Sequence, residues 1–342
     1  MGCGRFEHGG NVYAHPGCVD FSASLNPLGM SRGVREALAQ NVDAFSLYPD
    51  PRCARLTDAL ARLEEVPREW IVACAGATDA FARICAVVRP QEAMVCSPCY
   101  SGYEQSLEQV GCAVRYHVLL QKDDFALVGL PAGGVCQDVV FLTNPNNPTG
   151  RCIEREVLVT WLEDARKHGT TVVLDECFID LTLREGSNCL LGTYPNLVLV
   201  KALTKSFALA GLRVGYAMCS VERFSERLRA AGQPWAVSVP AQLAGEACLC
   251  DEGYLERSRR LVDAQRTRLV GALRSHGLRV VPGEANYLLF KGPVDLGKRL
   301  LAAGILIRSC ANFRGLDDSW YRIAVRSPEE NDRLMEALGE VM

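Results

Sequence analysis

The sequence of 342 residues lacks an excess of basic residues. It has 37 lysines and arginines against 40 aspartates and glutamates, for a formal net charge of −3. Nucleic acid and anionic membrane surfaces therefore have no electrostatic basis for binding it. Apolar runs stay below the roughly 18 residues that span a bilayer, and the opening MGCGRFEHGG has no apolar signal-peptide core. We expect a cytoplasmic protein with neither a nucleic-acid nor a membrane partner.

Several motifs of other enzyme classes are absent too. No G-x-G-x-x-G follows a strand pattern, and there is no Walker motif and no G-x-S-x-G elbow. The single C-x-x-C, Cys96 to Cys99, has no second pair and no nearby histidine cluster, so no metal site is expected. Most of the sixteen cysteines stand singly in apolar segments, which favours buried free thiols. A metal or cluster protein that uses these cysteines is the alternative.

The apolar pattern predicts an α/β fold. Near-continuous apolar strands alternate with helices from about residue 70 to 215, which is typical of a mostly parallel sheet covered on both faces. After residue 216 the pattern changes, and one long charged helix over 254–276 could bridge two domains. A smaller α/β unit with two or three strands follows. The predicted organisation is an arm (1–30), a large domain (31–225), linking helices (226–276) and a small C-terminal domain (277–342).

The stretch Val198 to Tyr216 carries the first chemical signal. An apolar run leads into a polar turn with Lys201 and Lys205, and Arg213 follows eight residues after the second lysine. A lysine just past a buried strand can lose water, lower its pKa and form an imine with an aldehyde. An arginine nearby can hold a phosphate. Both residues could also be ordinary solvated charges.

Polar residues follow three other apolar strands. Gly76-Ala77-Thr78 precede a helix whose free N–H groups could bind an anion, although an ordinary capped turn is the alternative. Asn147 lies in a turn-rich segment, and Asp175 ends a buried strand, where open α/β sheets contact ligands. The arginines of the C-terminal domain form either a solvated basic edge or a site for a doubly anionic substrate: Arg308, Arg314, Arg322 and Arg326.

Taken together, these motifs resemble the fold-type I, aspartate-aminotransferase-like family of pyridoxal-phosphate enzymes. Asn-Pro-x-Asn-Pro-Thr-Gly over 144–150, the strand-end Asp175-Glu176, and Thr204-Lys205 followed by Gly211-Leu212-Arg213 occur in the family's order and spacing. The resemblance covers essentially the whole chain. It implies a large domain with a mostly parallel seven-stranded sheet between helices, a smaller α/β C-terminal domain, and pyridoxal 5'-phosphate as cofactor.

The resemblance also implies roles for the catalytic residues. Lys205, rather than Lys201, would hold the cofactor as a Schiff base and later move a proton. Asp175 would pair with the pyridine nitrogen and keep the ring an electron sink. Asn147 would hydrogen-bond the phenolic oxygen, and Tyr100 would stack on the ring.

The cofactor phosphate and the dimer follow from the same resemblance. Tyr48 resembles a tyrosine that reaches the phosphate of a neighbouring subunit, which implies a homodimer. Two positions depart from the family: Phe178 replaces a tyrosine and Ala202 replaces a serine. The residues implied to hold the phosphate within one chain are Gly76, Ala77, Thr78, Thr204 and Arg213.

Within the family, the chain resembles two groups that act on phosphorylated amino compounds. One comprises the threonine-phosphate decarboxylases of cobalamin biosynthesis, and the other the histidinol-phosphate aminotransferases. The arm sequence, Phe178 and the run Arg322-Ile-Ala-Val-Arg326 favour the first. The implied substrate-binding residues are His8, Gly9, Asn11, Asn26, Arg308, Arg322 and Arg326.

The expected reaction is decarboxylation of L-threonine O-3-phosphate to (R)-1-amino-2-propanol O-2-phosphate, with L-serine O-phosphate as a further substrate. Arg322 would bind the carboxylate, and Arg308 with His8 and Asn11 would bind the substrate phosphate. The alternatives are an aminotransferase and a cofactor-binding protein without catalysis.

Overall fold

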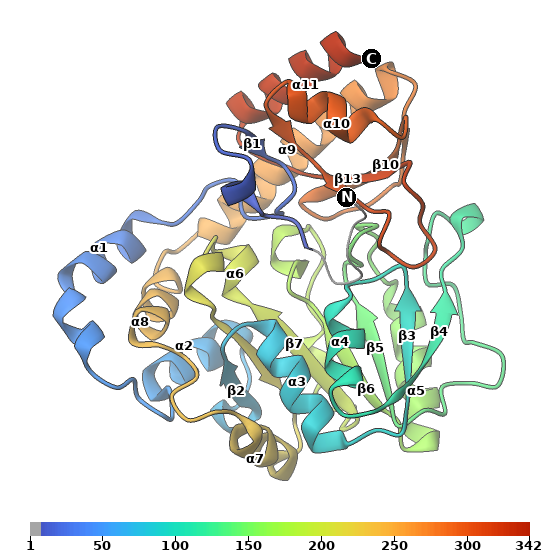
Figure 1. Ribbon diagram of the computed structural model, residues 1–342. Helices are drawn as coiled ribbons and strands as arrows, with labels where there is room; N and C mark the ends of the chain where they lie inside the picture. The colour runs from blue at the N-terminus through green and yellow to red at the C-terminus, as the bar shows by residue number, and fades with distance from the viewer. Residues whose placement is uncertain (1–7) are drawn as a thin grey trace.

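The computed structural model describes residues 8–342, so the first seven residues of the arm predicted over 1–30 lie outside the described part. A seven-stranded sheet forms the centre of the large domain (Figure 1). Its strands are parallel except β8, which runs antiparallel to both of its neighbours. The order is β2 (Ile71–Cys74), β8 (Gly215–Met218), β7 (Leu197–Ala202), β6 (Thr171–Asp175), β5 (Val139–Thr143), β3 (Glu92–Ser97) and β4 (Ala113–Val118).

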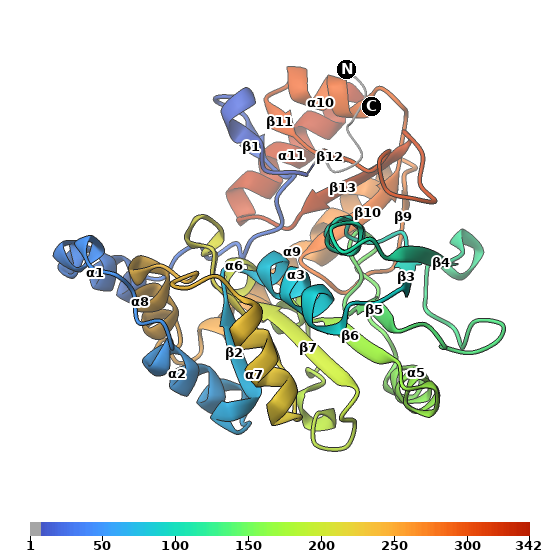
Figure 2. The same cartoon turned by 60° about the horizontal axis from the view of Figure 1, so that its bottom comes forward.

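Helices cover both faces of this sheet, which confirms the predicted layers (Figures 1 and 2). All residues of β5 are buried, because its side chains meet helices on either side. One face packs against α3 (Ala77–Val88), α4 (Gly102–Glu108) and α7 (Glu222–Ala231). The other face packs against α2 (Ala54–Glu64), α5 (Arg155–His168) and α8 (Val239–Cys248).

The small domain has a four-stranded antiparallel sheet, larger than the two or three strands predicted. Its order is β12 (Arg308–Ser309), β13 (Trp320–Ala324), β10 (Tyr287–Lys291) and β9 (Arg279–Val280), covered by α10 (Leu296–Ala302) and α11 (Pro328–Val341). β11 (Ile305–Leu306) lies outside this sheet and pairs with β1 (Val19–Asp20) of the arm. The arm is therefore tied to the small domain, beside which it lies in Figure 1.

The predicted linking segment, 226–276, divides between the domains. α8 packs on α1 (Arg32–Gln40) and α2, as part of the large domain. α9 (Tyr254–Ser275) contacts η5 (Ile179–Leu181) of the large domain and also β9, β10 and α11 of the small one. The long charged helix expected from the sequence thus spans both domains.

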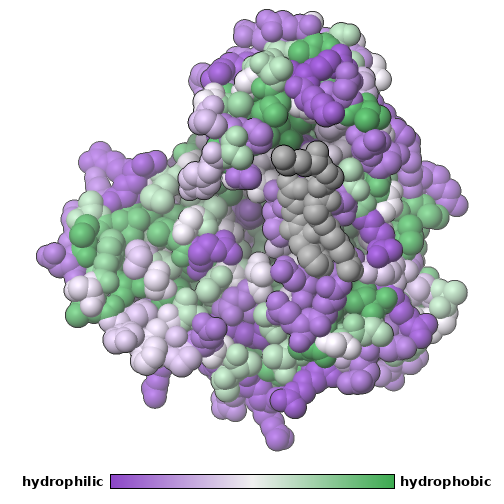
Figure 3. Space-filling model, viewed as in Figure 1, coloured by the Kyte–Doolittle hydropathy of each residue, from purple (hydrophilic) through white to green (hydrophobic). Residues whose placement is uncertain are grey.

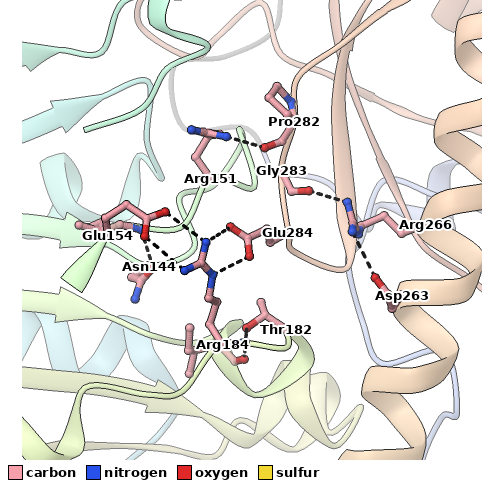
Figure 4. Close-up of polar contacts among 12 residues, drawn as sticks. Asn144, Arg151, Glu154, Thr182, Arg184, Asp263, Arg266, Pro282, Gly283 and Glu284 are labelled. Atoms are coloured by element: carbon pink, nitrogen blue, oxygen red, sulfur yellow. Dashed lines mark hydrogen bonds and ion pairs between the residues drawn. The ribbon is translucent and has the colours of Figure 1, made fainter. Parts of the chain in front are cut away.

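A second connection lies just after the asparagine-rich turn (Figure 4). Arg184 of the large domain forms ion pairs with Glu154 and with Glu284 of the small domain. The backbone N–H of Glu284 donates to the Gly150 carbonyl at 2.7 Å, and Arg151 donates to the Pro282 carbonyl. The small domain therefore docks directly against the segment that carries Asn147.

A buried ion cluster lies beneath the lysine-bearing turn. Lys201 at the end of β7 is 2.8 Å from Glu64 of α2 and 2.8 Å from Asp180 of η5. The side chains of Lys201 and Glu64 are nearly inaccessible, and that of Asp180 is largely buried. The Tyr216 hydroxyl also donates to Glu64. Two carboxylates raise the pKa of Lys201 above its ordinary value, against the opposing effect of burial. Lys201 thus stays charged and holds three elements together.

Replacing this central cation tests the cluster. We expect Lys201→Met to lower the free energy of unfolding by about 3–5 kcal/mol, because it leaves two buried carboxylates without their cation. Urea unfolding followed by circular dichroism measures the change. Arg184→Met is the control, since its exposed ion pairs are worth about 1 kcal/mol or less. Equal losses for the two variants would contradict this account of the cluster.

Candidate active site

A cavity of about 570 Å³ lies where the carboxyl ends of the parallel strands face the small domain. Its walls come from three separate parts of the chain: the arm, the strand ends of the large domain, and the loop between β12 and β13. The space-filling view shows a recess between the two domains (Figure 3). Strands β3, β6 and β7 deliver residues to it because their carboxyl ends meet at one edge of the sheet.

Lys205 lies in α6 (Leu203–Ser206), the short turn that directly follows β7. Burial, followed by repulsion from the nearby Arg322, lowers the pKa of its amine to about 8, and Arg213 acts in the same direction. Lys201, which belongs to the ion cluster, does not line the cavity. The structure therefore brings Lys205 to the site, as predicted, with an amine that is easily made neutral.

The turn that carries Lys205 is held by Asn26 of the arm. The Asn26 backbone N–H donates to the Lys205 carbonyl at 3.1 Å, and its side-chain amide donates to the Ser206 carbonyl and to Ser258, both at 2.7 Å. Ser206 in turn donates to Asp180. Asn26, predicted to bind substrate, is buried outside the cavity lining, with its amide N–H groups already used. Its observed contacts position the lysine turn instead.

Asp175, at the end of β6, faces the cavity with both oxygens already hydrogen-bonded. Oδ1 accepts from the backbone N–H of Cys177, and Oδ2 accepts from the Tyr103 hydroxyl at 2.6 Å. Burial raises the pKa of this carboxyl, whereas the hydrogen bonds oppose the rise. Sequence reasoning missed Tyr103. No local pattern marks it, because its partner Asp175 lies 72 positions away in the sequence.

Three further predicted residues surround the same space. Tyr100 lies on one wall, with its hydroxyl 3.4 Å from Thr78 Oγ1. Phe178 lies beside the lysine, whose Nζ is 5.8 Å from the ring centroid. The Asn147 carbonyl oxygen accepts a hydrogen bond from Arg322, so its amide group is left to act as a donor.

An anion site is formed at one end of the cavity. α3 begins at Ala77 rather than after Thr78, so the N–H groups of Ala77 and Thr78 lie in its first turn. Gly76 has a φ of 84°, and a Cβ there would come within 2.8 Å of the Arg213 guanidinium. Glycine therefore lets Arg213 lie close to the helix start. Thr204 lines the cavity beside it.

A second cationic region lies at the opposite, small-domain side. Arg322 of β13 is buried and donates to Asn147 and to the Ser22 carbonyl. Arg308 of β12 is also buried, and its guanidinium donates to Asn312 at 2.7 Å. His8 lines this region, where burial and Arg308 lower its pKa. The site therefore has cations for two anionic groups.

Gly9 and Arg314 shape the mouth of the cavity. A Cβ on Gly9 would lie 2.3 Å from the Ser22 carbonyl oxygen, so the arm can turn there only at a glycine. The Arg314 guanidinium lies 3.7 Å above the Tyr116 ring and 4.0 Å from Glu104. The loop between β12 and β13 thereby reaches across to the large domain.

Three other predicted site residues lie outside the cavity lining. Asn11 is exposed at the start of a short helical turn in the arm. Arg326 pairs with Glu330 in the first turn of α11. Tyr48 is 80% exposed and packs at a tilt against Trp235, with ring centroids 4.7 Å apart. Within one chain, none of the three is placed to contact a ligand in the cavity.

The residues present fit pyridoxal 5'-phosphate. The cofactor needs an amine for its aldehyde, an acid partner for its ring nitrogen, a ring contact and a dianion site. Lys205, Asp175, Tyr100 and the start of α3 with Arg213 supply these around one cavity. The two cationic ends match a cofactor phosphate at one side and substrate anions at the other. The arrangement can bind an amino compound that carries two negative groups.

Comparison with known proteins agrees with this geometry. A family model described as aminotransferase class I and II matches residues 16–338. Threonine-phosphate decarboxylase of Salmonella typhimurium is 37% identical over 98% of this chain and 96% of that protein. Histidinol-phosphate aminotransferase of Clostridium acetobutylicum has a TM-score of 0.84 and 27% identity, covering 94% and 98% of the two chains. L-threonine-O-3-phosphate decarboxylase of Porphyromonas gingivalis has a TM-score of 0.82 and 27% identity, covering 94% of this chain and 98% of that chain.

The lowered pKa of Lys205 predicts how cofactor capture depends on pH. Only the neutral amine attacks an aldehyde, so with a pKa of about 8 the capture rate should rise about tenfold per pH unit up to pH 8 and then level off. Stopped-flow absorbance of pyridoxal phosphate added to cofactor-free protein measures this rate. In Arg322→Leu the midpoint should move to higher pH, because a repelling cation is gone. A wild-type rate that still rises steeply at pH 10 would contradict the prediction.

Proposed function

We propose that this chain, which belongs to the aminotransferase class I and II family, decarboxylates L-threonine O-3-phosphate to (R)-1-amino-2-propanol O-2-phosphate. The observation that carries the proposal is the second cationic region, where Arg308, Arg322 and His8 gather apart from the Arg213 end. A substrate with both a carboxylate and a phosphate matches it. The 37% identity to a threonine-phosphate decarboxylase over nearly the full length supports the same substrate.

The chain is a pyridoxal-phosphate-dependent enzyme, as both its family and the residues that line its cavity indicate. When bound, the cofactor supplies an electron sink for the pair left at the substrate Cα. Asp175 would hold the ring nitrogen, Asn147 and Tyr100 the ring, and Arg213 with the start of α3 the phosphate. A cofactor-binding protein without catalysis is disfavoured, because Lys205 and Asp175 are both present and both face the cavity.

The distribution of positive charge selects the bond that breaks. The Arg308 and His8 side of the cavity would take the dianionic phosphate, which is the stronger anion. The carboxylate is then left in a less stabilised position, and its bond to Cα breaks with release of carbon dioxide. Lys205 Nζ, with a pKa lowered to about 8, would donate the proton that replaces the carboxylate at Cα. No second substrate is consumed, because the cofactor is regenerated.

An aminotransferase that acts on histidinol phosphate is the second candidate. The likeness to the Clostridium acetobutylicum enzyme supports it, since the TM-score of 0.84 is as high as that of the decarboxylase structure. Such an enzyme would instead remove the Cα proton through Lys205. Both reactions would use the same site residues, so the fold alone does not distinguish between them.

Product analysis separates the two reactions. With L-threonine O-phosphate and pyridoxal phosphate, we expect one carbon dioxide released per substrate consumed, without any keto acid present. L-serine O-phosphate should react more slowly by about ten- to a hundredfold, because one methyl group is worth about 1–3 kcal/mol of discrimination. Lys205→Ala is the inactive control. The decarboxylase assignment would be overturned if L-threonine O-phosphate released no carbon dioxide, while separate samples with histidinol phosphate and 2-oxoglutarate formed glutamate.

We also propose that the active unit is a homodimer in which Tyr48 enters the neighbouring site. Tyr48 is strongly exposed and lies next to the apolar side chains of η2 (Val42–Ser46) and Leu47, which are exposed as well. Apolar residues gather over α1 and α8 on the face seen in Figure 3. A second copy of the chain would cover this surface and bring Tyr48 to the phosphate end of its partner's cavity.

Mixing two inactive variants tests the shared site. In a hybrid of Tyr48→Ala and Lys205→Ala subunits, one of the two sites keeps both residues. Denaturing and refolding an equal mixture should therefore restore about a quarter of the wild-type activity in a two-fold dimer. Each variant refolded alone is the control. If native mass spectrometry shows that hybrid dimers have formed, but the activity of the mixture does not exceed the sum of the two controls, the shared site is excluded.

A further inference from the structure

Tyr103 makes an unusual contact for a core aromatic residue. Its ring is fully buried in α4, yet its hydroxyl lies 2.6 Å from Asp175 Oδ2 and 2.9 Å from Thr143 Oγ1. A phenol has one proton to give. The contact with Asp175 has the short distance of a hydrogen bond to a carboxylate, so Tyr103 donates to Asp175 and accepts from Thr143. The three residues form a directed chain of hydrogen bonds that ends on the acid.

Packing leaves the Tyr103 ring no room to turn away. Phe81 meets it edge-on at 5.0 Å between ring centroids, and Phe141 stacks on it at 5.1 Å. Tyr100, the ring that lines the cavity, meets it at 5.5 Å and 83°. The hydroxyl is therefore fixed at Asp175 by apolar contacts on several sides. The direction in which Asp175 faces is fixed with it.

We propose that Tyr103 is the positioning residue that keeps Asp175 ionised and aimed at the ring nitrogen of the cofactor. A buried carboxyl favours its neutral form, because charge is poorly solvated there. A hydrogen bond from Tyr103, like that from the Cys177 N–H, stabilises the carboxylate. An ionised Asp175 can hold a proton on the ring nitrogen, whereas a neutral acid cannot. Tyr103 thus acts on the cofactor only through Asp175, without touching it.

The proposal rests on the cofactor and not on the choice of substrate. It makes a prediction about binding that is independent of turnover. Pyridoxal 5'-phosphate and its 1-deaza analogue, in which C–H replaces the ring nitrogen, share the aldehyde, phenol and phosphate. The ratio of their dissociation constants therefore reports the contact between Asp175 and the ring nitrogen alone.

The experiment measures both dissociation constants by equilibrium dialysis for wild type and Tyr103→Phe. Wild type should prefer pyridoxal phosphate, and the preference should fall about ten- to a hundredfold in the variant, as expected for loss of one hydrogen bond to a charged group. Tyr321→Phe is the matched control: it removes a hydroxyl bonded to two backbone carbonyls of the small domain, and should leave the ratio unchanged.

A second variant covers the case in which Tyr103→Phe does not fold. Thr143→Val removes the donor to Tyr103, weakens the chain of hydrogen bonds and should lower the same ratio by a smaller factor. An unchanged ratio in the folded variants, even with both compounds bound more weakly, would overturn the proposal, because a merely structural tyrosine affects both compounds alike. Failure of wild type to bind either compound would instead overturn the cofactor assignment.

Discussion

The site depends on the amine of Lys205, which must lose its proton easily inside a cavity lined by cations that bind anions. Burial and the nearby Arg322 lower the pKa of Lys205 to about 8, and Arg213 adds to the effect. The same two arginines lie at opposite ends of the cavity, where the cofactor phosphate and the substrate would bind. Each anion that binds offsets part of this repulsion, so the amine becomes more basic as the site fills. Ligand binding thus changes the basicity of the Lys205 amine through charge alone.

The rest of the fold serves to keep that amine in place. Asn26 of the arm holds the turn that carries Lys205, and the ion cluster of Lys201 lies beneath it. The small domain docks on the segment after Asn147 through Glu284 and Gly150, while Arg322 reaches back to Asn147 itself. The contact between the two domains therefore completes the site. Residues from the arm, both domains and the connecting turn must all be correctly placed before it can function.

Sequence alone predicted the parts of this site that follow strand ends. Continuous apolar runs predict the parallel strands; Asp175 ends one of them, and Lys205 lies in the short helical turn that follows another. β8 was missed because its four residues follow the lysine stretch closely, separated from β7 only by the short turns α6 and η7 (Ala210–Leu212). Asn26 and Tyr103 act through partners up to 232 positions away in the sequence, which no local pattern records. Asn26 resembled a ligand-binding loop residue, and Tyr103 was given no role.

The central claim is that Lys205, and not the buried Lys201 four residues earlier, is the amine that takes the cofactor. Reduction of the loaded enzyme with borohydride fixes the aldehyde carbon to its amine, and peptide mass spectrometry then locates the modified lysine. We predict a single pyridoxyl phosphate group on Lys205, with Lys201 unmodified in its ion cluster. Modification of Lys201 or of a surface lysine, with Lys205 left intact, would contradict the account.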